Sequence, residues 1–452
     1  MPMRVQNPLQ RGAGAPAPGT VVPRLNPESR LLLGPGPQNA DPRVHAAMAL
    51  PQIGHMDPDF LRIMEDIKMM LRYMWQTENA FTVPVSGTGS AAWEAAIANL
   101  TEQGDKHLIC VNGYFGERAL DMHSRFTDVV EKIQKNYGEP FTPEEIRAAL
   151  EKHKPKLMWL CHAETSTGML QDRVGEIGKL CRQHDCLLML DTVTSICGAP
   201  IYLDDWRVDA AYAGGQKCMG CPPGISALSL GPRALAKLEN RKGKVKSWYL
   251  DMSMIKKYMM DTPAPAAGGG QAAPPARVYH HTAPISMAYA MREALTNVAE
   301  EGLENSWARH QKTAAYFRKA VTSPDFLPTK NGQPLMKPLE LLPLASQNQL
   351  PALTLVKVPA GIDGKQVVKQ MREEFEIEIG AALGQFAGKY WRIGFMGYNS
   401  SARAVAACLS ALRKCIDDQA NAQDASTRNK DAVRSAQVAD PGAFAAAGRS
   451  KL

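Results

Sequence analysis

The sequence predicts an α/β protein in which helices cover a mostly parallel sheet. Between residues 80 and 230, short apolar runs alternate with amphipathic segments, as strands and helices do in this fold class. Several runs are apolar throughout and end in turn residues, which is typical of strands buried on both faces. The chain has 452 residues and so exceeds the ~250–300 residues at which one core stops growing, so we expect two domains.

The predicted elements of the first domain follow one another in order. We expect strands at FTVPVS, HLICVN, KLMWLCH, CLLMLD, DAAYAG and ISALSLG, with helices at SAAWEAAIANL and ERALDMHSRF. The segment TPEEIRAALEKH predicts a helix that begins with a capping box, because Thr142 is followed by Glu145. Ligands in such sheets bind at the carboxyl ends of strands, so residues that follow these strands are the first candidates for a site.

The pattern changes after residue 300. Helices are predicted around 301–321 and 364–375, strands at ALTLVKV and FEIEIG, and a last helix from Ser401 to about Cys415. We therefore expect a large domain over residues 31–300 and a smaller C-terminal α+β domain over residues 301–417.

Three segments lack the periodicity of helices or strands. Residues 1–30 and 418–452 predict flexible tails, and 262–277, TPAPAAGGGQAAPPAR, predicts a flexible insertion. The first tail has four arginines and one acidic residue, a feature of mitochondrial presequences. Its prolines oppose the amphipathic helix of such a presequence, which favours a plain disordered arm. The second tail ends in Ser450-Lys451-Leu452, which predicts import into peroxisomes by the receptor that binds this tripeptide.

Composition argues against several other classes of protein. The net charge of +7 comes without a dense run of lysine and arginine, so we expect no nucleic-acid partner. No stretch approaches the ~18 apolar residues of a membrane span. Nine scattered cysteines without a secretory signal predict reduced thiols. Cys218 and Cys221 form the one CxxC; a zinc site would require a second ligand pair, and buried thiols are favoured over a redox pair.

Three segments contain groups that suit one cofactor. Lys217 follows the run DAAYAG on a glycine-rich turn, where a lysine is often simply solvated. Asp191 ends a very apolar strand, where a carboxylate requires a partner such as a protonated pyridine nitrogen, a salt bridge or a helix cap. Residues 86–90, SGTGS, lead into a helix and can bind phosphate through backbone amides. Together they favour pyridoxal phosphate.

These segments resemble the class V (fold type I) aminotransferases, and most closely the alanine–glyoxylate and serine–glyoxylate aminotransferases. The resemblance implies a large domain with a mostly parallel mixed sheet, plus a smaller C-terminal domain. It covers residues 31 to about 417 through these motifs: LLLGPGPQNADPRV, VSGTGSAAWEAAIANL, NGYFGERA, HAETSTGMLQ, LDTVTS, AGGQKCMGCPPG, YHHTAPISMAYAMREAL and YWRIGFMG.

The resemblance also implies a role for each site residue. Lys217 would form the Schiff base and act as the catalytic base, and Asp191 would pair with the pyridinium nitrogen. Phe115 and Val193 would pack on the two faces of the ring, although relatives often have tryptophan in place of Phe115. The other implied contacts are Thr88, Gly89, Ser90 (often histidine in relatives) and Gln216 with the phosphate, Thr165 with the ring hydroxyl, Tyr279 and Thr282 with the phosphate of a neighbouring subunit, and Gly36 and Arg392 with the substrate.

The implied activity is transfer of an amino group from alanine or serine to glyoxylate, giving glycine, in a homodimer. The substrates would be small amino acids and 2-oxo acids. One alternative is an aminotransferase of the ureidoglycine–glyoxylate type. Another, a non-catalytic peroxisomal scaffold, conflicts with the intact set of Lys217, Asp191 and Arg392. A cysteine desulfurase would need a nucleophilic cysteine on a loop ahead of the carboxylate-binding arginine. This function is disfavoured because no cysteine lies between Cys221 and Cys408.

Overall fold

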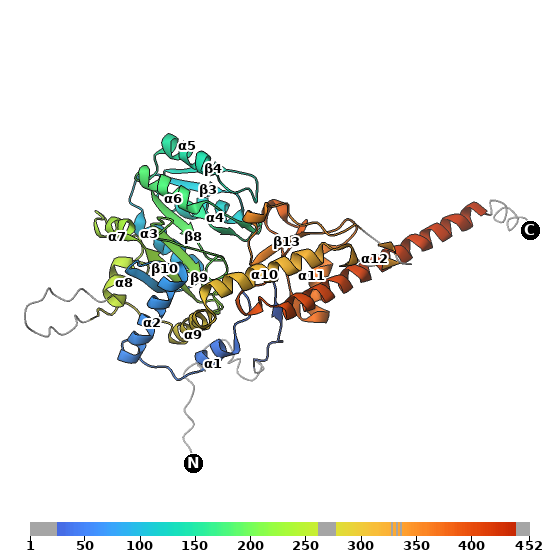
Figure 1. Ribbon diagram of the computed structural model, residues 1–452, viewed down its shortest axis with the longest axis horizontal. Coiled ribbons are helices and arrows are strands. Elements are labelled where there is room, and N and C mark those ends of the chain that lie inside the picture. The colour runs from blue at the N-terminus through green and yellow to red at the C-terminus, as the bar shows by residue number, and fades with distance from the viewer. Residues whose placement is uncertain (1–24, 261–276, 327–328, 331–332, 335–336, 440–452) are drawn as a thin grey trace, which may run out of the picture. The chain divides into compact units, whose positions relative to one another are not determined.

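The computed structural model describes residues 25–260, 277–326, 329–330, 333–334 and 337–439 (Figure 1). Residues 25–30 belong to a separate N-terminal unit, and the chain from Leu31 onward forms one compact unit. This second unit has the predicted α/β fold. Most of the predicted N-terminal tail and insertion, and the Ser450-Lys451-Leu452 end, lie outside the described residues.

A seven-stranded sheet forms the centre of the fold, and six of its strands were predicted as apolar runs. Strand β10 runs antiparallel to both β2 and β9, and the other neighbours are parallel, so the sheet is mixed but mostly parallel. The strands, in spatial order, are β2 (Phe81–Ser86), β10 (Ile225–Leu230), β9 (Ala210–Gly214), β8 (Leu187–Asp191), β5 (Leu157–Cys161), β3 (His107–Val111) and the partly exposed edge strand β4 (Val130–Gln134).

Helices connect these strands and pack with them into one large hydrophobic core. The predicted capping box begins α5, where the Thr142 hydroxyl accepts from the Glu145 amide at 3.3 Å and the Glu145 carboxylate accepts from the Thr142 amide at 2.8 Å. The helices of this part are α1 (Pro42–Met48), α2 (Pro58–Trp75), α3 (Gly89–Leu100), α4 (Tyr114–Ser124), α5 (Pro143–His153), α6 (Val174–Gln183), α7 (Pro232–Glu239), α8 (Met252–Met259) and α9 (Ile285–Glu301). A short hairpin, β6 (Ala163–Glu164) and β7 (Met169–Leu170), follows β5.

A second hydrophobic cluster contains side chains from the C-terminal part, among them Phe317, Trp391 and Leu412. Strands β13 (Leu353–Lys357), β16 (Tyr390–Gly394) and β15 (Gly380–Ala381) form its antiparallel sheet. Leu33 also packs in this cluster, because β1 (Leu31–Leu32) pairs with β14 (Ile377–Glu378). The domain boundary at residue 300 stays a prediction. The remaining elements are α10 (Leu303–Val321), α11 (Gly364–Phe375), β11 (Thr329–Lys330) and β12 (Gln333–Pro334).

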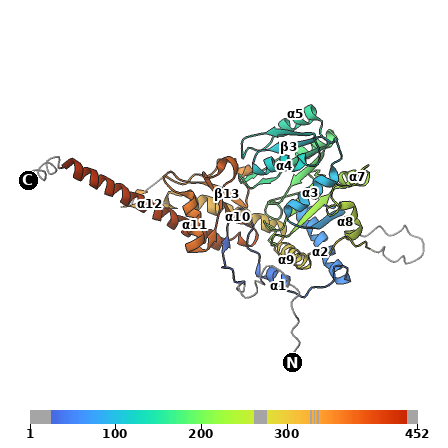
Figure 2. The ribbon, with the colours of Figure 1, turned by 180° about the vertical axis from the view of Figure 1, so that it is seen from behind.

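The last helix, α12 (Ala402–Ala439), is much longer than predicted. It lies beside α10 and α11 in both views (Figure 1 and Figure 2). The prediction of a flexible tail from residue 418 is therefore wrong for residues 418–439. Few apolar residues indicate disorder, but this stretch is rich in alanine and glutamine, which favour helix, and has no proline before Pro441. Burial of Val405, Leu412 and Ile416 anchors the first turns. Across the described residues, no helix combines the length and apolarity needed to cross a membrane.

Candidate active site

A cavity of about 200 Å³ lies at the carboxyl ends of the central strands. Its lining comes from turns that follow five different strands, so the sheet gathers residues that are distant in sequence. Nine of the predicted site residues line it: Thr88, Gly89, Ser90, Phe115, Thr165, Asp191, Val193, Gln216 and Lys217.

Asp191 is the last residue of β8 and is buried beneath this cavity. Its Oδ1 accepts a hydrogen bond from the Val193 amide at 2.9 Å, and its Oδ2 accepts from the Tyr212 hydroxyl at 2.7 Å. Burial raises the pKa of Asp191 to about 6, although both hydrogen bonds and the charge of Lys217 act to lower it. A buried carboxylate requires hydrogen-bonding or charged partners, and Tyr212 is one of them. The sequence does not predict Tyr212 as a site residue.

Lys217 lies in the turn after β9, and its side chain is almost fully buried. Its Nζ donates a hydrogen bond to the carbonyl oxygen of Pro35. Burial, together with the nearby charge of Arg392, lowers the pKa of Lys217 to about 8. About one tenth of this amine is therefore uncharged at pH 7, far more than of an ordinary lysine, and a lysine nucleophile requires this uncharged form.

Gly36 brings the backbone of the N-terminal segment against this lysine. Its φ of +101° favours glycine, and a Cβ at this position would lie 2.6 Å from the Lys217 Nζ. Any side chain would therefore displace the lysine. Gly36 thus lies against the amine, and its contact with the substrate stays a prediction.

The predicted phosphate-binding residues surround the first turn of α3. Thr88 is the N-cap, yet its side chain makes no capping hydrogen bond, and Ser90 is exposed. The amides of this turn and the positive end of the helix dipole suit an anion. Gln216 lies at the same cavity, and its Oε1 is buried with no hydrogen-bond partner among the described residues. This oxygen can therefore accept a hydrogen bond from a polar ligand.

Two residues that the sequence analysis missed stand beside Phe115. The Glu164 carboxylate is fully buried and accepts from the amides of Ser166 at 2.9 Å and Phe115 at 3.2 Å; burial raises its pKa to about 7. The guanidinium of Arg118, which also lines the cavity, lies 5.0 Å from the Phe115 ring centroid. Glu164 carries the same signal that marked Asp191, an acidic residue just after a buried strand.

Arg392 reaches the site from the C-terminal sheet. It lies on β16, where its Nε donates to the Ala381 carbonyl at 2.8 Å and its Nη1 to the Thr165 carbonyl at 3.4 Å. Burial lowers its pKa to about 10, so the guanidinium stays charged at neutral pH. Nη2 makes no hydrogen bond within the described part of the chain, so this side of the guanidinium is free to bind a carboxylate.

Four of the predicted site residues are not part of the cavity lining. Gly36 and Arg392 lie next to Lys217, whereas Tyr279 and Thr282 lie elsewhere. Both are exposed in the segment before α9, and Tyr279 has 57% of its surface accessible. Its ring centroid lies 5.1 Å from that of His55. Within one chain, the structure therefore does not bring these residues to Lys217.

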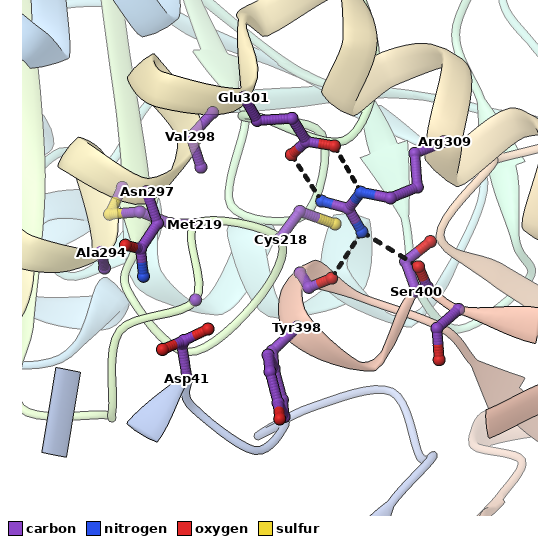
Figure 3. A pocket seen from close by; sticks show the side chains of 13 residues that line it. Asp41, Cys218, Met219, Ala294, Asn297, Val298, Glu301, Arg309, Tyr398 and Ser400 are labelled. Atoms are coloured by element: carbon purple, nitrogen blue, oxygen red, sulfur yellow. Dashed lines mark hydrogen bonds and ion pairs between the residues drawn. The ribbon is translucent and has the colours of Figure 1, made fainter. Parts of the chain in front are cut away.

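A second cavity, of about 320 Å³, lies beside the residues that directly follow Lys217 (Figure 3). Cys218 and Met219 line it, and none of the predicted site residues does. Arg309 forms a bidentate ion pair with Glu301 there. It also donates hydrogen bonds to the carbonyl oxygens of Gly397 at 2.7 Å and Ser400 at 3.1 Å (Figure 3). These contacts hold the turn before α12 against α9 and α10.

The two cysteines of the CxxC segment are buried. Burial raises the pKa of Cys218 to about 12 and that of Cys221 higher still, so both thiols stay protonated and poorly nucleophilic. In the part of the chain that the structure describes, no three histidine, cysteine, aspartate or glutamate side chains gather as a metal site would require.

The arrangement of the cavity fits pyridoxal phosphate. Gln216 and the amides of α3 suit the phosphate, the buried carboxylate of Asp191 suits a pyridinium nitrogen, and the amine of Lys217 suits the aldehyde. This is the chemistry of a pyridoxal-phosphate-dependent aminotransferase.

Comparisons with known proteins agree with this class. Residues 43–386 match the family model "Aminotransferase class-V", and the chain belongs to this family. It is 39% identical to an alanine–glyoxylate aminotransferase of Felis catus over 88% of this chain and 90% of that one. It is 32% identical to an (S)-ureidoglycine–glyoxylate transaminase of Bacillus subtilis over 86% of this chain and 90% of the relative. The crystal structure of an alanine–glyoxylate aminotransferase from Nostoc sp. superposes with a TM-score of 0.79 at 47% identity, covering 87% of this chain and 97% of the other.

Proposed function

We propose that this aminotransferase moves the amino group of alanine or serine to glyoxylate and thereby makes glycine. The observation that carries the proposal is that Lys217 and Asp191 line one small cavity and that Arg392 contacts Thr165 of the same lining, in a chain similar over most of its length to alanine–glyoxylate aminotransferases. The buried guanidinium of Arg392, in contact with Thr165 of the cavity lining, suits small substrates with one carboxylate.

Lys217 would hold the cofactor covalently and move the proton of the substrate α-carbon. Its lowered pKa, about 8, gives it both the free amine and the basicity that these two tasks require. When bound, pyridoxal phosphate supplies the electron sink that makes this proton acidic. Phe115 and Val193 would enclose the ring, and Thr165 would contact its hydroxyl.

Arg392 would bind the α-carboxylate of the amino acid and, in the second half-reaction, that of the oxo acid. Its Nη1 already contacts the Thr165 carbonyl, so the substrate would be held next to the residue at the ring hydroxyl. Arg118 is a second cation at the cavity, and the sequence analysis did not weigh it. It is exposed and stacked on Phe115, so aspartate and glutamate remain poor donors in this proposal.

The functional unit would be a homodimer in which each subunit completes the phosphate site of the other. The exposed apolar side chains Trp248, Val278 and Tyr279, with Thr282 beside them, support an interface here. A hybrid of one Lys217→Ala subunit and one Tyr279→Phe/Thr282→Ala subunit would regain one intact site. Tight cofactor binding by a strictly monomeric species would contradict this arrangement.

Import into peroxisomes by way of Ser450-Lys451-Leu452 also belongs to the proposal. Deleting these three residues should leave an active enzyme in the cytosol. Peroxisomal localisation that persists after the deletion would refute the signal.

A panel of donors and acceptors tests the substrate assignment. Alanine, serine and (S)-ureidoglycine should be assayed as donors, with glyoxylate, pyruvate and 2-oxoglutarate as acceptors. We expect the highest kcat/KM with glyoxylate and with alanine or serine. A preference for 2-oxoglutarate would overturn the assignment. A preference for (S)-ureidoglycine would favour the activity named for the Bacillus subtilis relative.

A further inference from the structure

Asp191 is reached from inside the sheet by two aromatic side chains. Tyr212 on β9 pairs directly with Asp191 on β8, and Trp159 on β5 pairs with Met189, two residues before Asp191. Side chains alternate between the faces of a strand, so Trp159, Tyr212 and Asp191 share one face. Trp159 and Tyr212 are fully buried.

When Asp191 is ionised, the hydrogen bonds between these residues have only one possible direction. Trp159 Nε1 lies 2.9 Å from the Tyr212 hydroxyl, which lies 2.7 Å from Asp191 Oδ2. An indole nitrogen can only donate, so the hydroxyl oxygen of Tyr212 accepts from Trp159. The phenolic proton is then directed to the Asp191 carboxylate, and the polarised hydroxyl is a stronger donor than an isolated one.

A third aromatic ring fixes this pair in place. Trp93 on α3 stacks on both rings, with centroid distances of 5.5 Å to Trp159 and 5.4 Å to Tyr212 and interplanar angles of 13° and 14°. Trp93 itself lines the cofactor cavity. The two hydrogen-bonded residues are therefore packed against a side chain of the cavity lining, which keeps both of them directed toward Asp191.

We propose that Trp159 and Tyr212 are positioning residues that keep Asp191 ionised and aimed at the ring nitrogen of pyridoxal phosphate. This inference rests on the proposed role of Asp191. Val193 and Tyr212 each occupy one carboxylate oxygen, and each oxygen has a second lone pair for the pyridinium proton. Without the tyrosine proton, the buried carboxylate loses one of the donors that offset its desolvation.

Other titratable groups also face Asp191 and must be considered in any pH measurement. Lys217 favours the ionised carboxylate, and its charge falls above its pKa of about 8. Glu164 carries a second buried carboxyl with a pKa of about 7, whose negative charge opposes that of Asp191. The Cys161 thiol stays protonated because burial raises its pKa.

The test compares Tyr212→Phe with the wild-type protein, using pyridoxal phosphate as the probe. Phenylalanine keeps the ring against Trp93 and removes only the hydroxyl. We expect the dissociation constant of the cofactor to rise about 10-fold near pH 8, as for a lost hydrogen bond to a charged group. The loss should grow toward pH 6, because Asp191 then takes up its proton at a higher pH. With ¹⁵N-labelled cofactor, the ring-nitrogen shift should move toward that of the unprotonated ring.

Trp159→Phe is the matched variant, since it leaves the tyrosine in place and weakens only its polarisation. We expect the dissociation constant of the cofactor and the ¹⁵N shift of its ring nitrogen to change in the same direction as in Tyr212→Phe, but by less. If Tyr212→Phe does not fold, the ¹⁵N shift of Trp159→Phe decides the matter.

Asp191→Asn separates this inference from the function on which it rests. If Asp191→Asn itself leaves the ¹⁵N shift unchanged, the proposed role of Asp191 is wrong. If Asp191→Asn shifts the resonance while Tyr212→Phe and Trp159→Phe both match the wild type at every pH, the inference about Tyr212 and Trp159 is overturned alone.

Discussion

The carboxyl edge of the seven-stranded sheet and the small sheet β13–β16–β15 contribute to the same site in different ways. The large sheet supplies the cofactor side through residues that follow five strands, and Asp191 and Lys217 are both buried there. The small sheet supplies one side chain, Arg392, whose Nη1 contacts the carbonyl of Thr165, in the turn between β6 and β7, at the long distance of 3.4 Å. Cofactor binding and substrate binding should therefore respond to different mutations.

The largest effect is expected on the cofactor side, from Lys217→Ala. This variant removes the covalent attachment and the base at once, so turnover should fall by at least roughly 10²–10⁴-fold. The fold should be retained, because a buried amine that pairs with one carbonyl adds little stability. Steady-state turnover and a thermal melt measure the two quantities. Near-normal transamination would remove Lys217 from the mechanism.

A smaller and different effect is expected on the substrate side, from Arg392→Lys. A lysine keeps the charge but loses the planar fork, which costs on the order of 1.5–3 kcal/mol, or roughly 10–100-fold in binding. KM should rise for the amino donor and for glyoxylate alike, because both use the same carboxylate site. The dissociation constant of pyridoxal phosphate should not change; if it rises as much as KM, the two sides are not separable.

The pH dependence of cofactor capture tests how the two regions are coupled. Lys217 has a pKa lowered to about 8, so its uncharged fraction, and with it the rate of covalent capture, should rise through pH 8 and then level off. An ordinary lysine would continue to gain reactivity toward pH 10. Arg392→Gln removes a positive charge that contributes to the lowering, so the midpoint should move up. Stopped-flow absorbance of the cofactor-free protein provides the rates, and an unmoved midpoint would show that burial alone sets this pKa.

The smallest effect is expected far from both regions, at the capping box of α5. Thr142→Ala removes the hydroxyl that accepts from the Glu145 amide, which should cost about 1 kcal/mol of the free energy of unfolding. Chemical denaturation measures this loss. KM and cofactor affinity should match the wild type, and a change in either would indicate that the site is sensitive to stability in general.

The same two regions differ in how far the sequence could predict them. Asp191 and Lys217 were recognisable because a charged group at the end of an apolar strand is costly to bury without a partner, and so indicates a site. Glu164 carried the same signal and was overlooked. The sequence could not identify Tyr212 and Trp159 as site residues. Both lie inside buried apolar runs, where the sequence does not reveal which aromatic side chains make a hydrogen bond.

In the C-terminal region, the sequence predicted the elements better than their extent. The bounds of α11 were predicted as found, and those of α10 to within two residues. The sequence predicts too short a last helix because its low apolar content indicates disorder, whereas a helix anchored by the buried Leu412 and Ile416 continues through residues of high helix propensity. The contact between Arg392 and Thr165 joins segments 227 residues apart. Local sequence patterns carry no information about contacts between such distant segments.

The most direct test of the central claim is to find the residue that carries the cofactor. The holoenzyme is reduced with borohydride, digested, and its peptides are sequenced by mass spectrometry. We predict a single reduced pyridoxyl-phosphate adduct on Lys217, in the peptide that contains AGGQKCMGC, and none in Lys217→Ala treated in the same way. An adduct on another lysine of the wild-type protein, or an equal yield of adduct in Lys217→Ala, would contradict the account.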